Sequence, residues 1–94
     1  RGRGLMGRTS LPKGYALIIY PEWSIHTFFM RLAIDVLFVG RDDRIVGLVE
    51  AMPPSRPFAG VAPWRGRYVI EMPAGVIGAS GTAIGDQLVI TPPL

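Results

Sequence analysis

The chain has 94 residues, 49% of them hydrophobic, and a formal net charge of +3. This length fits one domain of about 50 to 200 residues, and the apolar fraction argues against a disordered chain. Because there is no cysteine, disulfides, thiolate metal ligands and cysteine nucleophiles are excluded.

The positive charge is concentrated in residues 1–14, "RGRGLMGRTSLPKG", which contain no acidic residue. The basic residues of this arm are Arg1, Arg3, Arg8 and Lys13. A basic arm can contact nucleic acid or anionic lipid, but this one has no aromatic residue to stack on bases. We therefore interpret it as a solvated terminus, able to form a short helical turn around Leu5 and Met6, and do not expect nucleic acid as a partner. We predict a single domain over residues 1–94, with a β core at 15–91.

Short runs rich in β-branched and aromatic residues follow the arm, and turn residues separate them. They predict strands at 15–21, 25–31, 34–40, 44–50 and 67–72, and a turn followed by a last strand within 85–90. The polar turn at 40–43 predicts a hairpin. Residues 44–50 are apolar on both faces, which suggests a central strand, and Gly47 within it suggests a bulge.

The remaining segments are loops and turns. Residues 51–66 hold four prolines and two glycines and predict a loop. Residues 73–81 predict one helical turn, with Pro73 at its first position and Gly81 after its end. The predicted fold is therefore all-β: a small β-sandwich or partly open barrel of about six short strands, with one or two short helical turns.

No cofactor or metal motif is convincing. The stretch "GRGLMG" at 2–7 fits the dinucleotide-binding pattern by its letters, but Pro12 follows too soon and no βαβ unit follows it. A zinc site needs three or four ligands, and His26 is the chain's single histidine. We therefore expect neither a cofactor nor a bound metal. No uncharged apolar run reaches the roughly 18 residues of a membrane span, so we expect none in this chain.

The acidic residues on apolar strands are the most informative side chains. With the two-residue period of a strand, Asp35 shares a face with Leu37 and Val39. A buried carboxylate must find hydrogen-bond donors or take up a proton. Asp35 could pair with Arg31, Arg65 or Arg67, or it could accept backbone N–H groups at a strand end. Glu71 lies on the same face as Val69 and poses the same question.

Four stretches together resemble the bacterial and archaeal family called domain of unknown function 192. They are "RGLMGR" at 3–8, "SIHTFFMRLAIDVLFVGRDDRIVGLVEAMPP" at 24–54, "YVIEMPAG" at 68–75 and "GTAIGDQL" at 81–88. The resemblance implies a compact, mostly β domain of sandwich type and no established activity. It also implies a strand before "RGLMGR" that this chain lacks. The family pattern falls on Gly4, Leu5, Met6, Arg8, His26, Phe29, Met30, Asp35, Phe38, Glu71, Gly75, Gly85 and Asp86.

Three hypotheses about function follow. The first is a ligand-binding or accessory module with a polar cluster on an apolar sheet, whose candidate residues are Arg8, His26, Met30, Arg31, Asp35 and Glu71. The second is a hydrolase or lyase with Asp35 or Glu71 as general base, which requires His26, Asp35 and Glu71 to converge in one pocket. The third is an interaction module that pairs through an edge strand.

The corresponding partners are a small molecule or a protein, and we expect a monomer or a weak dimer. The chain starts at Arg1 rather than Met. We therefore expect that any targeting segment is missing, and both a cytoplasmic and an envelope or secreted location stay open.

Overall fold

The computed structural model describes residues 16–25, 32–54 and 59–88. Their elements are β1 (Leu17–Ile19), β2 (Ser24–Ile25), β3 (Ile34–Val39), the 3-10 turn η1 (Arg41–Asp43), β4 (Ile45–Met52), β5 (Ala59–Gly60), β6 (Tyr68–Pro73) and α1 (Val76–Ser80). All strand pairs are antiparallel, in a four-stranded sheet of order β1-β6-β3-β4 and a two-stranded sheet of β2 and β5.

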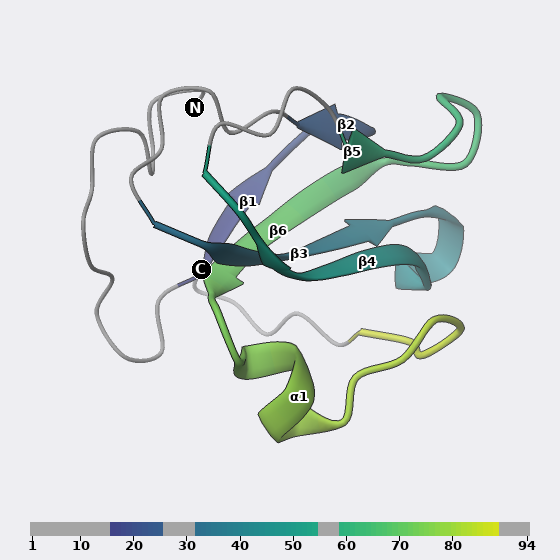
Figure 1. The fold of residues 1–94 in the computed structure, drawn as a ribbon. Coiled ribbons are helices and arrows are strands. Elements are labelled where there is room, and N and C mark those ends of the chain that lie inside the picture. The colour runs from purple at the N-terminus through teal and green to yellow at the C-terminus, as the bar shows by residue number, and fades with distance from the viewer. Residues whose placement is uncertain (1–15, 26–31, 55–58, 89–94) are drawn as a thin grey trace.

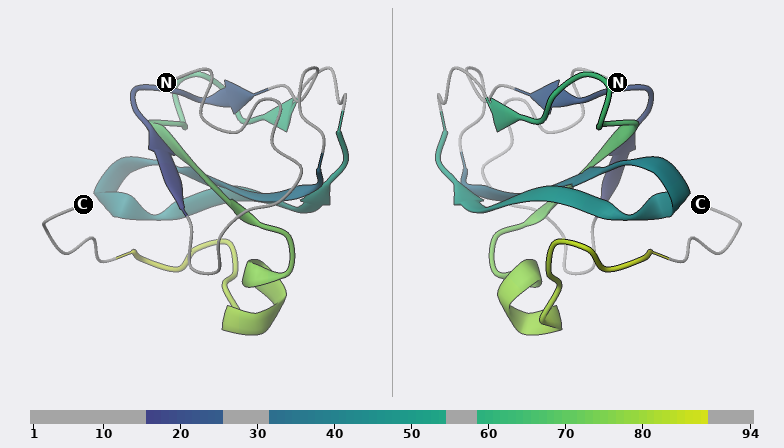
Figure 2. Two further views of the ribbon diagram at one scale, coloured as in Figure 1. Left: turned by 90° about the vertical axis from the view of Figure 1, so that its left-hand side faces the viewer. Right: turned by 90° about the vertical axis from the view of Figure 1, so that its right-hand side faces the viewer.

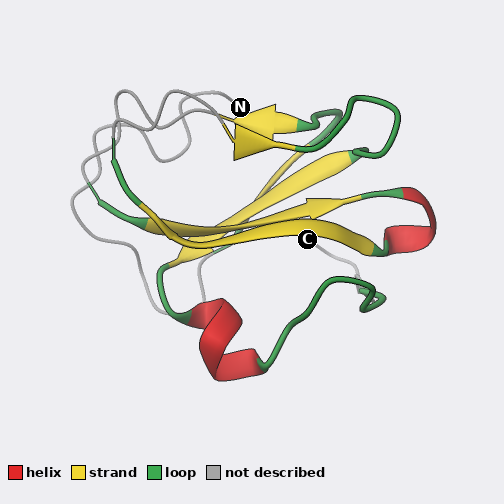
Figure 3. Cartoon of the chain, turned by 45° about the vertical axis from the view of Figure 1, so that its right-hand side comes forward, coloured by secondary structure: helices red, strands yellow, loops and turns green. Residues whose placement is uncertain are grey.

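The elements stack in three layers (Figure 1). The β2–β5 pair lies over one face of the four-stranded sheet, and α1 lies under the other face. Side views show the same order of layers (Figure 2). Strands dominate the described residues, and the helical segments are confined to α1 and η1 (Figure 3). The predicted class, a small mostly β fold with short helical turns, is confirmed, and the sheets do not close into a barrel.

The two layers on the sheet produce two apolar clusters, one on each face. The upper cluster, between the sheets, includes Val36 and Phe38 of β3, Val69 of β6 and Ala59 of β5. The lower cluster, beneath the sheet, includes Leu37, Val39, Ile70 and Met72 together with Ile77 of α1. Alternate residues of β3 and β6 thus fill opposite clusters, as the two-residue period of a strand requires.

The hairpin predicted around residues 40–43 is confirmed, since β3 pairs with β4 and η1 forms the connection. The predicted irregularity at Gly47 is also present, because Phe38 pairs with Gly47 whereas Val39 pairs with Ile45. The prediction that residues 44–50 form a central strand is wrong. In the described sheet β4 lies at the edge, and the central strands are β6 and β3.

Three other predicted boundaries differ from the structure. The predicted loop at 51–66 contains β5, which pairs with β2. Pro73 ends β6 rather than starting the helix, whose N-cap is Gly75, while Gly81 does follow the helix end. Residues 85–90 are predicted to hold a turn followed by a strand, and in their described part Gln87 forms an isolated bridge with Arg44. The rest of that strand and positions 26–31 of the second predicted strand lie outside the described residues.

Gly40 lies where β3 enters the turn, and the space around it predicts a stability effect. A Cβ atom built there would lie 2.5 Å from the carbonyl oxygen of Arg65, which is backbone and cannot swing away. We expect Gly40→Ala to lower the free energy of unfolding by about 1–3 kcal/mol, as overpacked substitutions do. Urea unfolding would measure it.

Gly78 supplies the matched control. It lies inside α1, and a Cβ there would be 3.5 Å from the nearest atom, a side-chain oxygen of Glu50. Because alanine favours helix over glycine, we expect Gly78→Ala to raise the free energy of unfolding by about 0.5–1 kcal/mol. Equal effects of the two substitutions would show that the close approach at Gly40 does not limit stability.

Candidate functional site

Asp35 is fully buried, and both of its carboxylate oxygens accept hydrogen bonds from the backbone. Oδ1 accepts from the N–H of Ala51 at 2.8 Å. Oδ2 accepts from the N–H of Gly75 at 3.1 Å and from that of Ile77 at 2.8 Å. Gly75 is the N-cap of α1 and has no side chain to accept the free N–H groups of the first helical turn. The carboxylate of Asp35, from β3, accepts one of them instead.

The local backbone explains this arrangement. Gly75, after the end of β6, has φ of 100°, and Ala51, near the end of β4, has φ of 49°; both depart from extended backbone, and their N–H groups are directed to Asp35. The register of β3 and β4 also shifts between Ile34 and Val36. Asp35 therefore joins β3, the end of β4 and the start of α1. Of the two structural interpretations, acceptance of backbone N–H groups is the one observed.

Glu71, in the middle of β6, is the other buried acidic residue among those described, with 5% of its surface exposed. It is in register with Leu17 of β1 and Val36 of β3, both of which belong to the upper apolar cluster. Its side chain thus lies on the face that the β2–β5 pair covers. Within the described ranges its carboxyl makes no hydrogen bond or ion pair, and its oxygens are not completely shielded from solvent. Burial raises the pKa of Glu71 from 4.5 to about 7.

Asp35 and Glu71 lie on opposite faces of the sheet. Asp35 bonds Ile77 beneath the sheet, whereas Glu71 is aligned with residues of the upper cluster. The two carboxyls therefore do not converge in one pocket, and the predicted convergence with His26 is wrong for this pair. Both oxygens of Asp35 accept backbone hydrogen bonds and its side chain has no exposed surface, so this geometry does not favour a general-base role for Asp35.

The remaining candidates, Arg8, His26, Met30 and Arg31, lie outside the described residues. In the described parts of the chain, no group of three or more His, Cys, Asp or Glu side chains is placed to hold a metal ion. No helix there is long and apolar enough to cross a membrane.

The fold and the two carboxyls define a class: a small domain of two antiparallel sheets and one short helix, with a buried aspartate joining sheet to helix and a buried glutamate on the other face. The model of the family DUF192, described as "Uncharacterized ACR", matches residues 1–90. The chain belongs to this family, which confirms the resemblance seen in its sequence motifs.

Similar proteins occur in archaea and bacteria. A UPF0127 protein of Thermococcus sibiricus is 37% identical over 93 residues, which are 94% of this chain and 58% of that protein. A UPF0127 protein of Pyrococcus furiosus is 36% identical over 70 residues, 69% of this chain and 53% of that protein. The chain thus spans little more than half the length of these curated relatives.

The fold also matches a solved structure. The crystal structure of a protein of unknown function from Novosphingobium aromaticivorans superposes with a TM-score of 0.80 at 24% identity, covering 92% of this chain and 64% of that one. This likeness supports the layered arrangement of sheets and helix described above.

Proposed function

We propose that this domain is a small ligand-binding module and that Glu71 is the group its ligand contacts. The observation that carries the proposal is the Glu71 carboxyl, buried on an otherwise apolar face and without a hydrogen-bond partner in the described ranges. No side-chain oxygen of the described residues is completely buried without a partner, so the unbonded Glu71 oxygens keep a little contact with solvent, where a ligand could reach them.

The chemistry of this carboxyl indicates the kind of ligand. Burial raises the pKa of Glu71 to about 7, so both the protonated and the ionised carboxyl are accessible near neutral pH. A ligand that carries an amine would favour the ionised form, because an opposite charge within a few ångströms lowers the pKa of a carboxyl. We therefore propose a small ligand with a protonated amine, seated against apolar side chains.

A thermal-shift panel of small amines and uncharged isosteres at pH 7 tests the proposal. We expect amines to stabilise the protein and to release protons from Glu71 on binding, measured by calorimetry in two buffers of different ionisation enthalpy. Glu71→Gln should weaken binding at least tenfold, since a charge-assisted hydrogen bond contributes about 1.5–3 kcal/mol. Glu50→Gln, at an exposed glutamate of β4, should leave binding unchanged. A panel without any shift, or hits that bind Glu71→Gln equally well, would contradict the proposal.

Arg8, His26, Met30 and Arg31 stay proposed members of the same site, to be replaced one by one against the ligands found. Asp35 is no longer a candidate for ligand contact, because its hydrogen bonds hold the fold.

General-base catalysis is a second candidate function, and it now depends on Glu71 alone. A carboxyl with a pKa near 7 suits a general base at neutral pH. Since the base must be ionised, such an activity would rise as the pH passes 7. An activity that Glu71→Gln abolishes would favour this function over simple binding.

The third candidate function is pairing with a partner chain through an edge strand. In the described sheet β1 and β4 are the edges, and residues 85–88 already bond Ile45 at the start of β4 and Asp43 in η1. The rest of β4 is the proposed pairing edge, consistent with a monomer or a weak dimer. Sedimentation velocity over a range of protein concentrations would distinguish a monomer from a weak dimer.

A further inference from the structure

A pocket of about 160 Å³ opens at one end of the four-stranded sheet, apart from Glu71. Here β1 and β3 end and β6 begins, since Ile19 pairs with Val69 and Val39 pairs with Tyr68. The lining residues are Tyr20, Gly40, Arg41, Asp42, Asp43, Arg67 and Tyr68. They come from three separate segments of the chain, which the strand order brings together.

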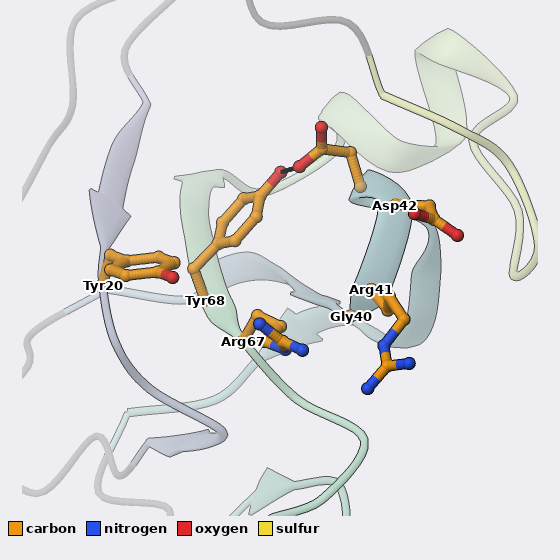
Figure 4. A pocket seen from close by; sticks show the side chains of 7 residues that line it. Tyr20, Gly40, Arg41, Asp42, Arg67 and Tyr68 are labelled. Atoms are coloured by element: carbon orange, nitrogen blue, oxygen red, sulfur yellow. Dashed lines mark hydrogen bonds between the residues drawn. The ribbon is translucent and has the colours of Figure 1, made fainter.

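The pocket lining carries two arginines and two aspartates, and the arginines gather at one rim. Arg41 and Arg67 are exposed, and neither makes an ion pair with any residue of the chain's described parts. Asp42 and Asp43 also line the pocket, but they lie apart from the guanidinium groups. Asp43 accepts a hydrogen bond from the Tyr68 hydroxyl at 2.8 Å. The Asp42 side chain is directed away from the two tyrosines, whereas both guanidinium groups lie toward the same rim (Figure 4).

The tyrosines form an aromatic wall. The rings of Tyr20 and Tyr68 lie 5.9 Å apart between centroids and are tilted by 42°. Tyr68 is buried, and its hydrogen bond to Asp43 fixes its ring. Tyr20 is 62% exposed, so much of its ring is available to a ligand. A planar group can therefore lie against Tyr20 while a charged group reaches the arginines.

We propose that this pocket binds a phosphate monoester of an aromatic or similarly planar compound. Guanidinium groups donate paired hydrogen bonds to phosphate oxygens. A phosphate monoester carries close to two negative charges at pH 7, which match two unpaired arginines better than a carboxylate with one charge does. The planar body contacts Tyr20.

Phenyl phosphate, inorganic phosphate and benzoate are the probes, titrated into ¹⁵N-labelled protein and followed by amide chemical shifts at low ionic strength. We expect phenyl phosphate to bind best, with shifts at Gly40, Arg41, Arg67 and Tyr68. Arg41→Gln and Arg67→Gln should each weaken it about tenfold or more, because each removes charge-assisted hydrogen bonds. Tyr20→Ala should remove the advantage of phenyl phosphate over inorganic phosphate.

Arg65→Gln is the matched control, since Arg65 is exposed and close by but does not line the pocket. It should change the affinity less than twofold. An effect of Arg65→Gln as large as those of the other two arginines would overturn the proposal in favour of unspecific attraction. Absence of shifts at about 10 mM phenyl phosphate, or shifts elsewhere only, would also overturn it. Glu71→Gln should leave this binding intact, so the outcome is separate from that of the amine site.

Discussion

Glu71→Gln should raise the free energy of unfolding by about 3 kcal/mol at pH 8 and leave it nearly unchanged at pH 4. Glutamine has almost the shape of a protonated glutamate but cannot ionise. The wild-type carboxyl must ionise above its pKa while it is surrounded by the upper apolar cluster. The substitution therefore removes an unfavourable charge rather than a contact.

The direction follows from the two pKa values. Burial raises the pKa of Glu71 from 4.5 to about 7, so the folded protein holds this proton more tightly than the unfolded chain does. Below pH 4.5 both states are protonated, and the contribution of Glu71 to stability is fully present. Between pH 4.5 and pH 7 the unfolded chain releases the proton first, and stability falls as the pH rises. Across this interval the loss is about 3 kcal/mol, at 1.36 kcal/mol for each pH unit.

Denaturant unfolding of the wild type and the variant from pH 4 to pH 9 measures this difference. Other titrating groups contribute equally to both proteins, so subtracting the two curves isolates Glu71. Glu50→Gln, at an exposed position, should show no such pH-dependent gap. Parallel curves for wild type and Glu71→Gln would mean that Glu71 ionises as easily in the fold as in the unfolded chain.

A stabilising Glu71→Gln would also bear on the proposed function. Active and binding sites often hold groups that lower stability, because the arrangement that serves a ligand is not the one that best serves the fold. Glu71 would be such a group, because its carboxylate would lower the stability of the protein at neutral pH and an amide at the same position would not. If an amine ligand then raises stability only in the wild type, the two experiments together identify Glu71 as its binding group.

The strand faces could be predicted from sequence because they depend on local periodicity. β3 and β6 are dense in β-branched residues, and their alternation placed Asp35 with Leu37 and Val39 and Glu71 with Val69, as observed. The same reasoning failed for β4. Its residues are apolar on both faces because both faces of the sheet are covered, not because the strand is central.

Features that depend on pairing over long distances could not be predicted. β5 has neither a β-branched nor an aromatic residue, and it is a strand because Ile25 and Ser24 pair with it. The pocket at the sheet end needs Tyr20, Arg41 and Arg67 together, which only the order β1-β6-β3 provides. The arginine at the hairpin turn was visible in the sequence, but nothing local indicated the aromatic wall beside it.

For Asp35, local periodicity predicts burial but does not identify the hydrogen-bond donors, and removing this residue should strongly lower stability. Its burial could be predicted, but the N–H groups that it accepts belong to Gly75 and Ile77, far along the chain, and to Ala51, an alanine with positive φ. Removing the carboxylate leaves these donors without an acceptor; the hydrogen bond from Ile77 is buried, and those from Ala51 and Gly75 are partly buried. Each unsatisfied buried donor lowers stability by about 1–3 kcal/mol.

We therefore expect Asp35→Ala to lower the free energy of unfolding by about 3–5 kcal/mol, a large part of the 5–15 kcal/mol typical of a domain. The amide protons of Gly75 and Ile77 should lose protection from hydrogen exchange first, because α1 loses its cap while the central strands stay paired. Asp86→Ala is the matched control. Its carboxylate also accepts a backbone N–H, that of Ala83 at 2.9 Å, but at an exposed turn where water replaces it, so the change should stay below about 1 kcal/mol. Equal effects of the two substitutions would mean that burial adds nothing to the value of these hydrogen bonds, and that Asp35 is retained for a reason other than joining the sheet to the helix.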